Sequence, residues 1–318
     1  MVVDDGPSAG EGHAKGFEGL ESVLGRKTGR LRTQGADIHY EVCGQGPVIV
    51  FAHGLGGSHL SWWQQVAHFS RHYQCVTFSH RGFSGSSVDA GQPDPAHFAD
   101  DLQALMAHLR ISHAHLVGQS MGGWTVVEYT LRHPQSVASL TLSSTTGSID
   151  PSSSASFDHD AFKRWGVEAA NAAQQCRQSG VHPAAGLRMA REQPALHLLY
   201  RKMDELSPAL DKEALRSRLR AMRVRAPQAL AAVRLPVLLI SPQEDIVIPP
   251  QALLSLSREV EGARLVEMPG TGHSPYFEAA QAFNAHLEAF FLGLDREAPQ
   301  ARPGVRAGVA HRPSTRSI

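Results

Sequence analysis

One short stretch decides the fold; it reads AHLVGQSMGG at residues 114–123. Its apolar start predicts a short buried strand, and the residues that follow it, 124–133, have the pattern of a helix. A turn this tight between strand and helix forces its central residue, Ser120, into a strained backbone conformation, and the glycines two positions before and after it relieve the crowding. The serine hydroxyl is therefore held above the sheet at the start of a helix, where backbone N–H groups favour an anion.

Apolar runs on both sides of this stretch predict the rest of the sheet. Alternating apolar and polar residues over 38–42 indicate a half-buried strand. Continuous apolar runs are typical of strands buried on both faces of a parallel sheet. Such runs occur at residues 48–52, 75–78, 116–117, 140–142, 237–240 and 265–266. Amphipathic segments such as 98–110 separate them. This alternation predicts an α/β fold with a mostly parallel, doubly wound sheet.

The alternation is interrupted once, after the sixth strand. The interval 148–232 has helical patterns and no buried strand, so we expect a helical cap inserted at this point. Both ends of the chain are polar and without periodicity, which is typical of flexible tails. The expected divisions are a core of residues 29–147 and 233–292, and tails of residues 1–28 and 293–318.

A serine hydroxyl needs a base to take its proton. In chains with this kind of nucleophile turn the order is serine, acid, histidine, so the partners lie downstream. His273 is part of GTGHSP, residues 270–275, which follows the last strand. Ligands and catalytic groups gather where parallel strands end, so His273 is the candidate base. Either Asp245 or Glu244, which follow the strand at 237–240, is placed to orient its imidazole.

Acyl transfer also needs N–H donors for the negative oxygen of its transition state. The first buried strand leads into a glycine-rich loop, HGLGG at residues 53–57. We expect an oxyanion hole made by the backbone N–H groups of Leu55, in this loop, and Met121, after the serine. His53 is expected to support the loop rather than to react. Neither the G-K-[ST] ending of a phosphate loop nor a dinucleotide-binding G-x-G-x-x-G is present in register.

Together these motifs resemble the α/β-hydrolase superfamily, in its esterase-like branch with a serine nucleophile. The resemblance covers about residues 30–292 and rests on the HGLGG loop, the GQSMGG turn and the Gly-His pair near the end. In that family the acid is commonly an Asp followed by three residues and a Pro. This favours Asp245, which stands in that relation to Pro249, over Glu244. Two positions in a neighbouring loop depart from the family pattern, Ser79 and Ser84.

The resemblance implies a catalytic triad of Ser120, Asp245 and His273 and a covalent acyl-enzyme. A serine nucleophile disfavours haloalkane dehalogenases and epoxide hydrolases, which carry Asp there. We expect a serine hydrolase of small, largely apolar carboxylic esters that uses no metal and no organic cofactor. Two alternatives stay open: a C–C bond or lactone hydrolase with the same triad, and a low-turnover ligand-binding receptor. Gly57 stands where C–C hydrolases usually have Pro, which disfavours that chemistry.

The substrate pocket is specified less well than the triad. Trp124 follows the serine turn, and Phe162, Trp165 and Leu199 lie in the expected cap, so these four are candidates for an apolar pocket. Large apolar side chains on helices also serve packing, and the sequence leaves both roles open.

Composition narrows the class of protein. Lys and Arg number 30 and so do Asp and Glu, and this neutral balance argues against nucleic-acid binding. No apolar run approaches the roughly 20 residues of a spanning helix, and the N-terminus lacks a secretory pattern. Three widely spaced cysteines form neither a disulfide framework nor a zinc site. We therefore expect a cytoplasmic protein. Its partner, as the resemblance implies, is a small-molecule ester or a related acyl substrate.

Overall fold

The computed structural model describes residues 25–297. Their nine strands form one sheet. The strands lie in the order β1-β2-β4-β3-β6-β7-β8-β9, and the short β5 pairs with β2. The first two strands are antiparallel to their neighbours, and all pairs from β4 to β9 are parallel. The strands are β1 (Lys27–Thr33), β2 (Ala36–Cys43), β3 (Val48–Ala52), β4 (Gln74–Phe78), β5 (Ser87–Val88), β6 (Ala114–Gln119), β7 (Val137–Ser143), β8 (Val237–Pro242) and β9 (Arg264–Met268).

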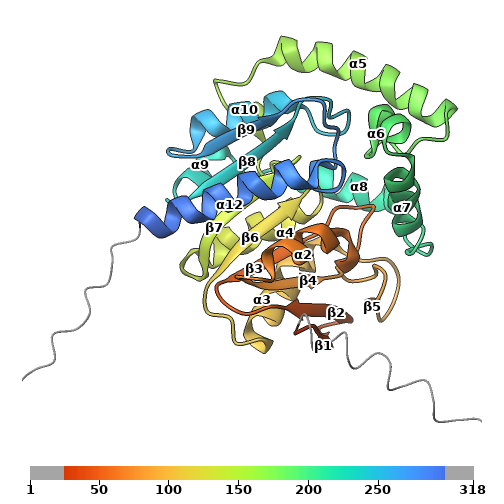
Figure 1. Ribbon diagram of the computed structural model, residues 1–318. Coiled ribbons are helices and arrows are strands. Elements are labelled where there is room, and N and C mark those ends of the chain that lie inside the picture. Colours follow the sequence, from red (N-terminus) through yellow and green to blue (C-terminus); the bar gives the residue numbers. More distant parts are fainter. Residues whose placement is uncertain (1–24, 298–318) are drawn as a thin grey trace, which may run out of the picture.

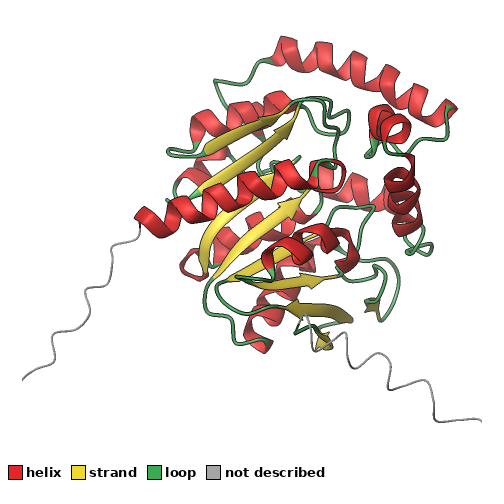
Figure 2. Cartoon of the chain, viewed as in Figure 1, coloured by secondary structure: helices red, strands yellow, loops and turns green. Residues whose placement is uncertain are grey.

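Helices cover both faces of the sheet, as Figure 2 shows. Neighbouring residues of β3 point to opposite faces, so Val50 belongs to one apolar cluster and Phe51 to the other. The cluster around Val50 includes residues of α3, α4, α9 and α10, and the cluster around Phe51 includes residues of α2, α11 and α12. A mostly parallel, doubly wound sheet is therefore confirmed. These helices are α2 (Trp63–Phe69), α3 (Phe98–His108), α4 (Gly122–Arg132), α9 (Pro227–Ala231), α10 (Pro250–Glu259), α11 (Pro275–Glu278) and α12 (Ala280–Glu297).

The chain reverses its direction across the sheet at β3, and this reversal positions the site. From β3 the chain moves to β4 on one side and then crosses to β6 on the other. Ala52, the last residue of β3, is in register with Gly118 of β6. The loops that leave these two strands are therefore level with each other. In open α/β sheets the crevice at such a point is where ligands bind.

Four helices lie between β7 and β8, within the interval expected to form a cap. They are α5 (His159–Gln178), α6 (Gly186–Glu192), α7 (Pro194–Asp204) and α8 (Lys212–Ala221). In Figure 1, α6, α7 and α8 lie beyond the arrowheads of the central strands, whereas α5 runs farther out, above α10. The segment that leaves β7 and the segment that returns to β8 lie side by side. Asp150 N donates to Arg225 O (2.7 Å), and Arg225 N donates to Ser148 O (3.0 Å).

Three boundaries differ from those expected. Leu230 of α9 packs with α4 and α10, so the end of the 148–232 interval belongs to the body. β1 begins at Lys27, where it pairs with Val42, and so the regular structure starts before residue 29. The last helix continues past residue 292 to Glu297, because Leu294 extends its apolar face. The remainder of both expected tails, 1–24 and 298–318, lies outside the described residues. In the described part, no helix combines the length and the apolar character needed to cross a membrane.

Candidate active site

Ser120 occupies a turn that only glycine neighbours permit. Its φ is +48°, in the left-handed region that L-residues rarely adopt, and its backbone N–H donates to Ser143 O on β7 (3.1 Å). A Cβ added at Gly122 would lie 2.1 Å from the carbonyl oxygen of Ala52, and one at Gly118 would lie 2.6 Å from a methyl of Val126. The close packing of β3, β6 and α4 therefore holds the strained serine at the N-terminus of α4.

His273 and Asp245 come together from the loops after β9 and β8. The Nδ1 atom of His273 donates to Oδ2 of Asp245 at 2.8 Å, and both side chains are buried. The other carboxylate oxygen, Oδ1, accepts the N–H groups of Val247 (2.7 Å) and Ile248 (2.9 Å). With its proton on Nδ1, the imidazole has a lone pair on Nε2 that is available to accept a proton. The backbone carbonyl of His273 accepts a hydrogen bond from the side chain of Gln119 (2.9 Å), the residue before Ser120.

The structure also separates Asp245 from Glu244. The carboxylate of Glu244 pairs with the guanidinium of Arg188, and about two-fifths of its side chain is exposed. Its backbone N–H donates to Thr271 O (2.9 Å), which ties the acid loop to the histidine loop. Asp245 is therefore the carboxylate that contacts the imidazole.

The loop after β3 packs directly against the serine turn. A Cβ at Gly54 would lie 2.1 Å from Oε1 of Gln119 and 3.3 Å from Cβ of Ser120. Leu55 and Met121 line the same cavity as Ser120 and His273. Within residues 25–297 the backbone N–H groups of Leu55 and Met121 have no hydrogen-bond acceptor. Two unused donors beside a nucleophile are what an oxyanion hole requires.

A buried chain of hydrogen bonds connects the loop after β3 to the body of the protein. Nδ1 of His53 donates to Gly54 O (2.8 Å), and its Nε2 accepts the backbone N–H of His80 (3.0 Å). The ring of His80 in turn contacts Oγ1 of Thr125 on α4 (2.8 Å). Burial lowers the pKa of His53 to about 3 and holds the pKa of His80 well below its ordinary value, so both rings are neutral near pH 7. His53 thus connects the loop to the body and lines no part of the cavity.

Comparison with known proteins agrees with this geometry. A family model described as "alpha/beta hydrolase fold" matches residues 47–280. This chain belongs to the α/β-hydrolase family. A relative named putative carbamate hydrolase RutD, from Agrobacterium fabrum, is 27% identical over 268 residues, which is 81% of this chain and 100% of the relative. A protein of that name from Klebsiella pneumoniae is 29% identical over 274 residues, 80% of this chain and 94% of the relative.

Solved structures that share the fold of this α/β hydrolase include proteins named for different activities. The enol-lactonase from Burkholderia xenovorans superposes with a TM-score of 0.65 at 24% identity, over 83% of this chain and 100% of that chain. A thermophilic esterase from Thermogutta terrifontis superposes with a TM-score of 0.65 at 22% identity, over 84% of this chain and 99% of that chain. At this level of identity the likeness shows the shared fold.

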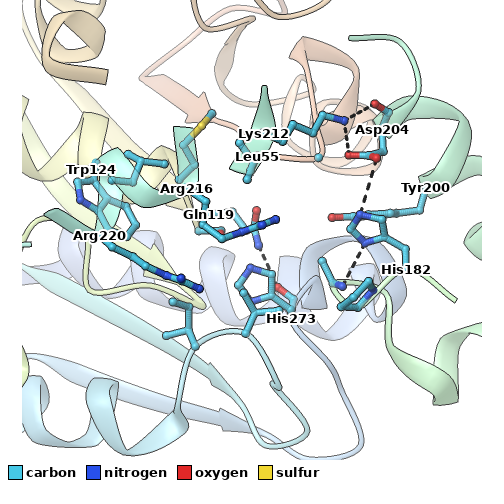
Figure 3. A pocket seen from close by; sticks show the side chains of 18 of the residues that line it. Leu55, Gln119, Trp124, His182, Tyr200, Asp204, Lys212, Arg216, Arg220 and His273 are labelled. Atoms are coloured by element: carbon cyan, nitrogen blue, oxygen red, sulfur yellow. Dashed lines mark hydrogen bonds and ion pairs between the residues drawn. The ribbon is translucent and has the colours of Figure 1, made fainter. Parts of the chain in front are cut away.

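In this α/β hydrolase the serine and the histidine open into one cavity of about 350 Å³. Its floor is the body, with Ser120, Met121, His273 and the acid loop, and its roof is formed by α7, α8 and the segment before α6 (Figure 3). The size lies at the lower end of the range of small-molecule sites. Ser120 and His273 therefore face a partly open cavity beneath the helices inserted between β7 and β8.

Of the four side chains expected to bind substrate, one lines this cavity. Trp124 lies in its wall, on the first turn of α4. Phe162 and Trp165 are outside, because α5 lies farther out and the indole of Trp165 donates to the carbonyl of Asp245 (2.8 Å). Leu199 is 39% exposed on the outer side of α7, the helix that turns Tyr200 inward. The inserted helices α7 and α8 line the cavity mostly with polar side chains, and Leu219 is an apolar exception.

Sequence reasoning missed a set of polar side chains in the roof. These are His182, Tyr200, Asp204, Lys212, Arg216, Arg220 and Arg223. Nδ1 of His182 accepts the N–H of Ala184 (3.1 Å), so its proton lies on Nε2, 3.8 Å from Asp204. Burial raises the pKa of Tyr200 to about 12, so its hydroxyl keeps its proton. The spacing of the basic residues over 212–223 was visible in the sequence, although a solvated helix face has the same pattern.

One group of side chains in the described part has the donors for a metal ion. These are His39, Glu41 and His59, whose ligand atoms lie within 4.8 Å of one another. Arg26 already donates to the carboxylate of Glu41. None of the three lines the cavity, so an ion held there would not contact the triad.

Proposed function

We propose that this α/β hydrolase cleaves small carboxylic esters through a covalent acyl-enzyme on Ser120. The observation that carries the proposal is the buried hydrogen bond between His273 and Asp245, in a cavity that also receives Ser120 and two unused N–H donors. This combination supplies a base, an orienting acid, a nucleophile and an oxyanion hole, which acyl transfer needs together.

In the proposed reaction, Ser120 Oγ attacks the ester carbonyl while Nε2 of His273 takes its proton. The N–H groups of Leu55 and Met121 stabilise the resulting oxyanion. Asp245 stabilises the imidazolium, which then gives the proton to the leaving alcohol. Water, activated by the same imidazole, hydrolyses the acyl-enzyme and restores the serine. No step needs a metal ion or an organic cofactor.

The proposal narrows the expected substrate. A cavity of about 350 Å³ suits a small molecule, and its body side offers apolar contacts from residues such as Leu55, Trp124 and Ile248. Its roof adds basic side chains, so we propose that the small, largely apolar ester also carries a polar or charged group on that side. Relatives and fold neighbours bear the titles carbamate hydrolase, enol-lactonase and esterase, all of which describe attack on an acyl carbonyl. Carbamates and lactones therefore belong in the substrate panel beside open esters.

The test compares Ser120→Ala with Ser257→Ala on p-nitrophenyl butyrate. Loss of one triad member typically costs several orders of magnitude, so we expect kcat/KM of Ser120→Ala to fall by at least about 10³-fold. Ser257 lies on α10 outside the cavity, and its variant should keep the wild-type rate. Ester hydrolysis by Ser120→Ala within tenfold of wild type would refute the proposal. Wild-type turnover limited to one acylation event would instead favour a ligand-binding receptor.

For the cellular location we propose the cytoplasm. The structure has Cys43, Cys75 and Cys176 as free, buried thiols, and Cys43 and Cys75 are register partners on β2 and β4. A small number of cysteines without a disulfide framework is typical of a protein from a reducing compartment. Fractionation of cells that express the full chain tests this, and recovery of the chain in the secreted fraction would refute it.

A further inference from the structure

A stripe of basic side chains on α8 faces the catalytic cavity. Lys212, Arg216, Arg220 and Arg223 are three or four residues apart, a spacing that places them on one face of a helix and its following turn. All four line the cavity, and Figure 3 shows Arg220 reaching into it toward His273. Arg218 lies on another face and pairs with Asp94 outside the cavity (2.6 Å).

Two of these four cations form no ion pair with a side chain of the described residues. Lys212 donates to the carboxylate of Asp204 (2.7 Å), and Arg216 pairs with Glu213. Within residues 25–297, neither Arg220 nor Arg223 forms a hydrogen bond or an ion pair through its side chain. The lining therefore carries an excess of positive charge next to the nucleophile.

Arg223 is the more unusual of the two. Its Nε is buried without an acceptor, and its guanidinium lies 4.9 Å from the centre of the Trp124 ring. Burial lowers the pKa of Arg223, the charge of Asp150 raises it in part, and the charge of Arg220 lowers it further. A buried N–H donor without an acceptor costs free energy, and an anionic ligand beside this half-buried guanidinium would offset that cost. The 4.9 Å distance to the Trp124 ring is within the range of a cation–π contact, which holds the guanidinium over the indole.

We propose that Arg220 and Arg223 form a subsite for a second, anionic group of the substrate, a carboxylate or a phosphate. The inference rests on the proposed function and adds the substrate class: an ester whose carbonyl lies at Ser120 and whose anion lies under α8. Guanidinium groups bind such oxyanions through two parallel hydrogen bonds. Ser120, Trp124 and Arg223 line one small cavity, and Arg223 lies over the Trp124 ring, so we expect a short spacer between the anion and the ester carbonyl.

The first test compares two esters of equal length. The anionic one is mono-p-nitrophenyl glutarate, and its neutral partner is methyl p-nitrophenyl glutarate. We expect wild-type kcat/KM to be at least tenfold higher for the anionic ester, mainly through a lower KM. Arg220→Gln and Arg223→Gln should each reduce this ratio at least fivefold, and Arg220→Lys should reduce it less, because an ammonium keeps the charge but loses the bidentate geometry. The control Arg218→Gln should keep the wild-type ratio.

Equal kcat/KM for the two esters in wild type would overturn the subsite, and so would arginine variants whose ratio is unchanged. In both cases hydrolysis of the neutral ester would still support the proposed function. The two proposals therefore fail separately in this assay.

A binding measurement makes the subsite testable without catalysis. Ser120→Ala protein is titrated with glutarate and, separately, with inorganic phosphate, and the tryptophan fluorescence is followed because Arg223 stacks on Trp124. Saturable binding that weakens at least tenfold when Arg220→Gln is added supports the subsite, and the tighter of the two anions identifies the group it takes. Absence of saturable binding by both anions would overturn it.

Discussion

Replacing Asp245 by Asn tests the triad with little disturbance of the fold. The oxygen of the new amide can still accept the N–H groups of Val247 and Ile248, which Oδ1 accepts in the native chain. Its NH₂ group then faces Nδ1 of His273 at the position of Oδ2, 2.8 Å away. Two donors cannot face each other, so Nδ1 must become the acceptor and the proton moves to Nε2. The imidazole then presents an N–H to Ser120 and loses its role as base.

The expected loss follows from this change of tautomer. In serine hydrolysis by a triad, the equivalent change lowers kcat by about 10⁴-fold, which is about 5.5 kcal/mol at 1.36 kcal/mol per factor of ten. The folding free energy should fall by only about 1–3 kcal/mol, since one charge-assisted hydrogen bond is lost and two hydrogen bonds are kept. The assay is the initial rate on p-nitrophenyl butyrate, with the thermal midpoint measured on the same samples.

Glu244→Gln is the matched control for this experiment. Glu244 is adjacent in sequence, but its carboxylate forms an exposed pair with Arg188, and such a pair contributes at most about 1 kcal/mol. We expect its kcat to stay within threefold of wild type. The reasoning would be refuted if Asp245→Asn kept more than a tenth of the activity, or if Glu244→Gln lost as much as Asp245→Asn.

Three further predictions concern packing, protonation and metals. Gly122→Ala places a Cβ 2.1 Å from the carbonyl of Ala52, so we expect the free energy of unfolding to fall by about 3 kcal/mol or more. Gly166→Ala lies in open space on α5 and should leave the thermal midpoint unchanged or raise it. Equal thermal midpoints for the two variants would contradict this prediction. Burial raises the pKa of Glu278 to about 7 from 4.5, so the native state holds a proton that the unfolded state has released between these values, and stability falls as pH rises from 4.5 to 7. Glu278→Gln still offers an oxygen to the backbone N–H of Gly272. The variant should be more stable than wild type at pH 8, by on the order of 2 kcal/mol, but not at pH 4. Denaturant unfolding at both pH values checks this, and the same stability difference between variant and wild type at pH 4 and pH 8 would count against it. Treatment with EDTA should leave ester hydrolysis within twofold, because the proposed steps use no metal, and a loss restored by Zn²⁺ would contradict the mechanism.

The geometry of the candidate site was largely predictable, because the motifs that carry its residues are short. The serine turn indicates glycines at 118 and 122 from its local pattern, and the structure gives the reason: a Cβ at Gly118 would meet Val126 of α4, and one at Gly122 would meet the Ala52 carbonyl of β3. The choice of Asp245 over Glu244 came from a family pattern, and its physical basis appears only in the fold. Val247 and Ile248 direct two N–H groups at the aspartate, while Arg188 of the cap pairs with the glutamate.

The roof of the cavity was not predictable, because it depends on how each cap helix is rotated and docked. Phe162 and Trp165 are as apolar as a pocket residue should be, yet α5 lies on the outer side and turns Trp165 to the backbone of Asp245. The basic residues of α8 have the sequence pattern of a solvated face, and only the docking of α8 over the serine makes them cavity residues. Local pattern indicates the candidate reacting groups, whereas tertiary docking determines which side chains line the cavity.

The most direct measurement is mass spectrometry of the protein quenched in acid during hydrolysis of p-nitrophenyl butyrate. The account predicts a mass increase of one butyryl group, located by peptide mapping at Ser120 and absent from Ser120→Ala protein. Product release without any acylated Ser120, or an acyl group at another residue, would contradict it.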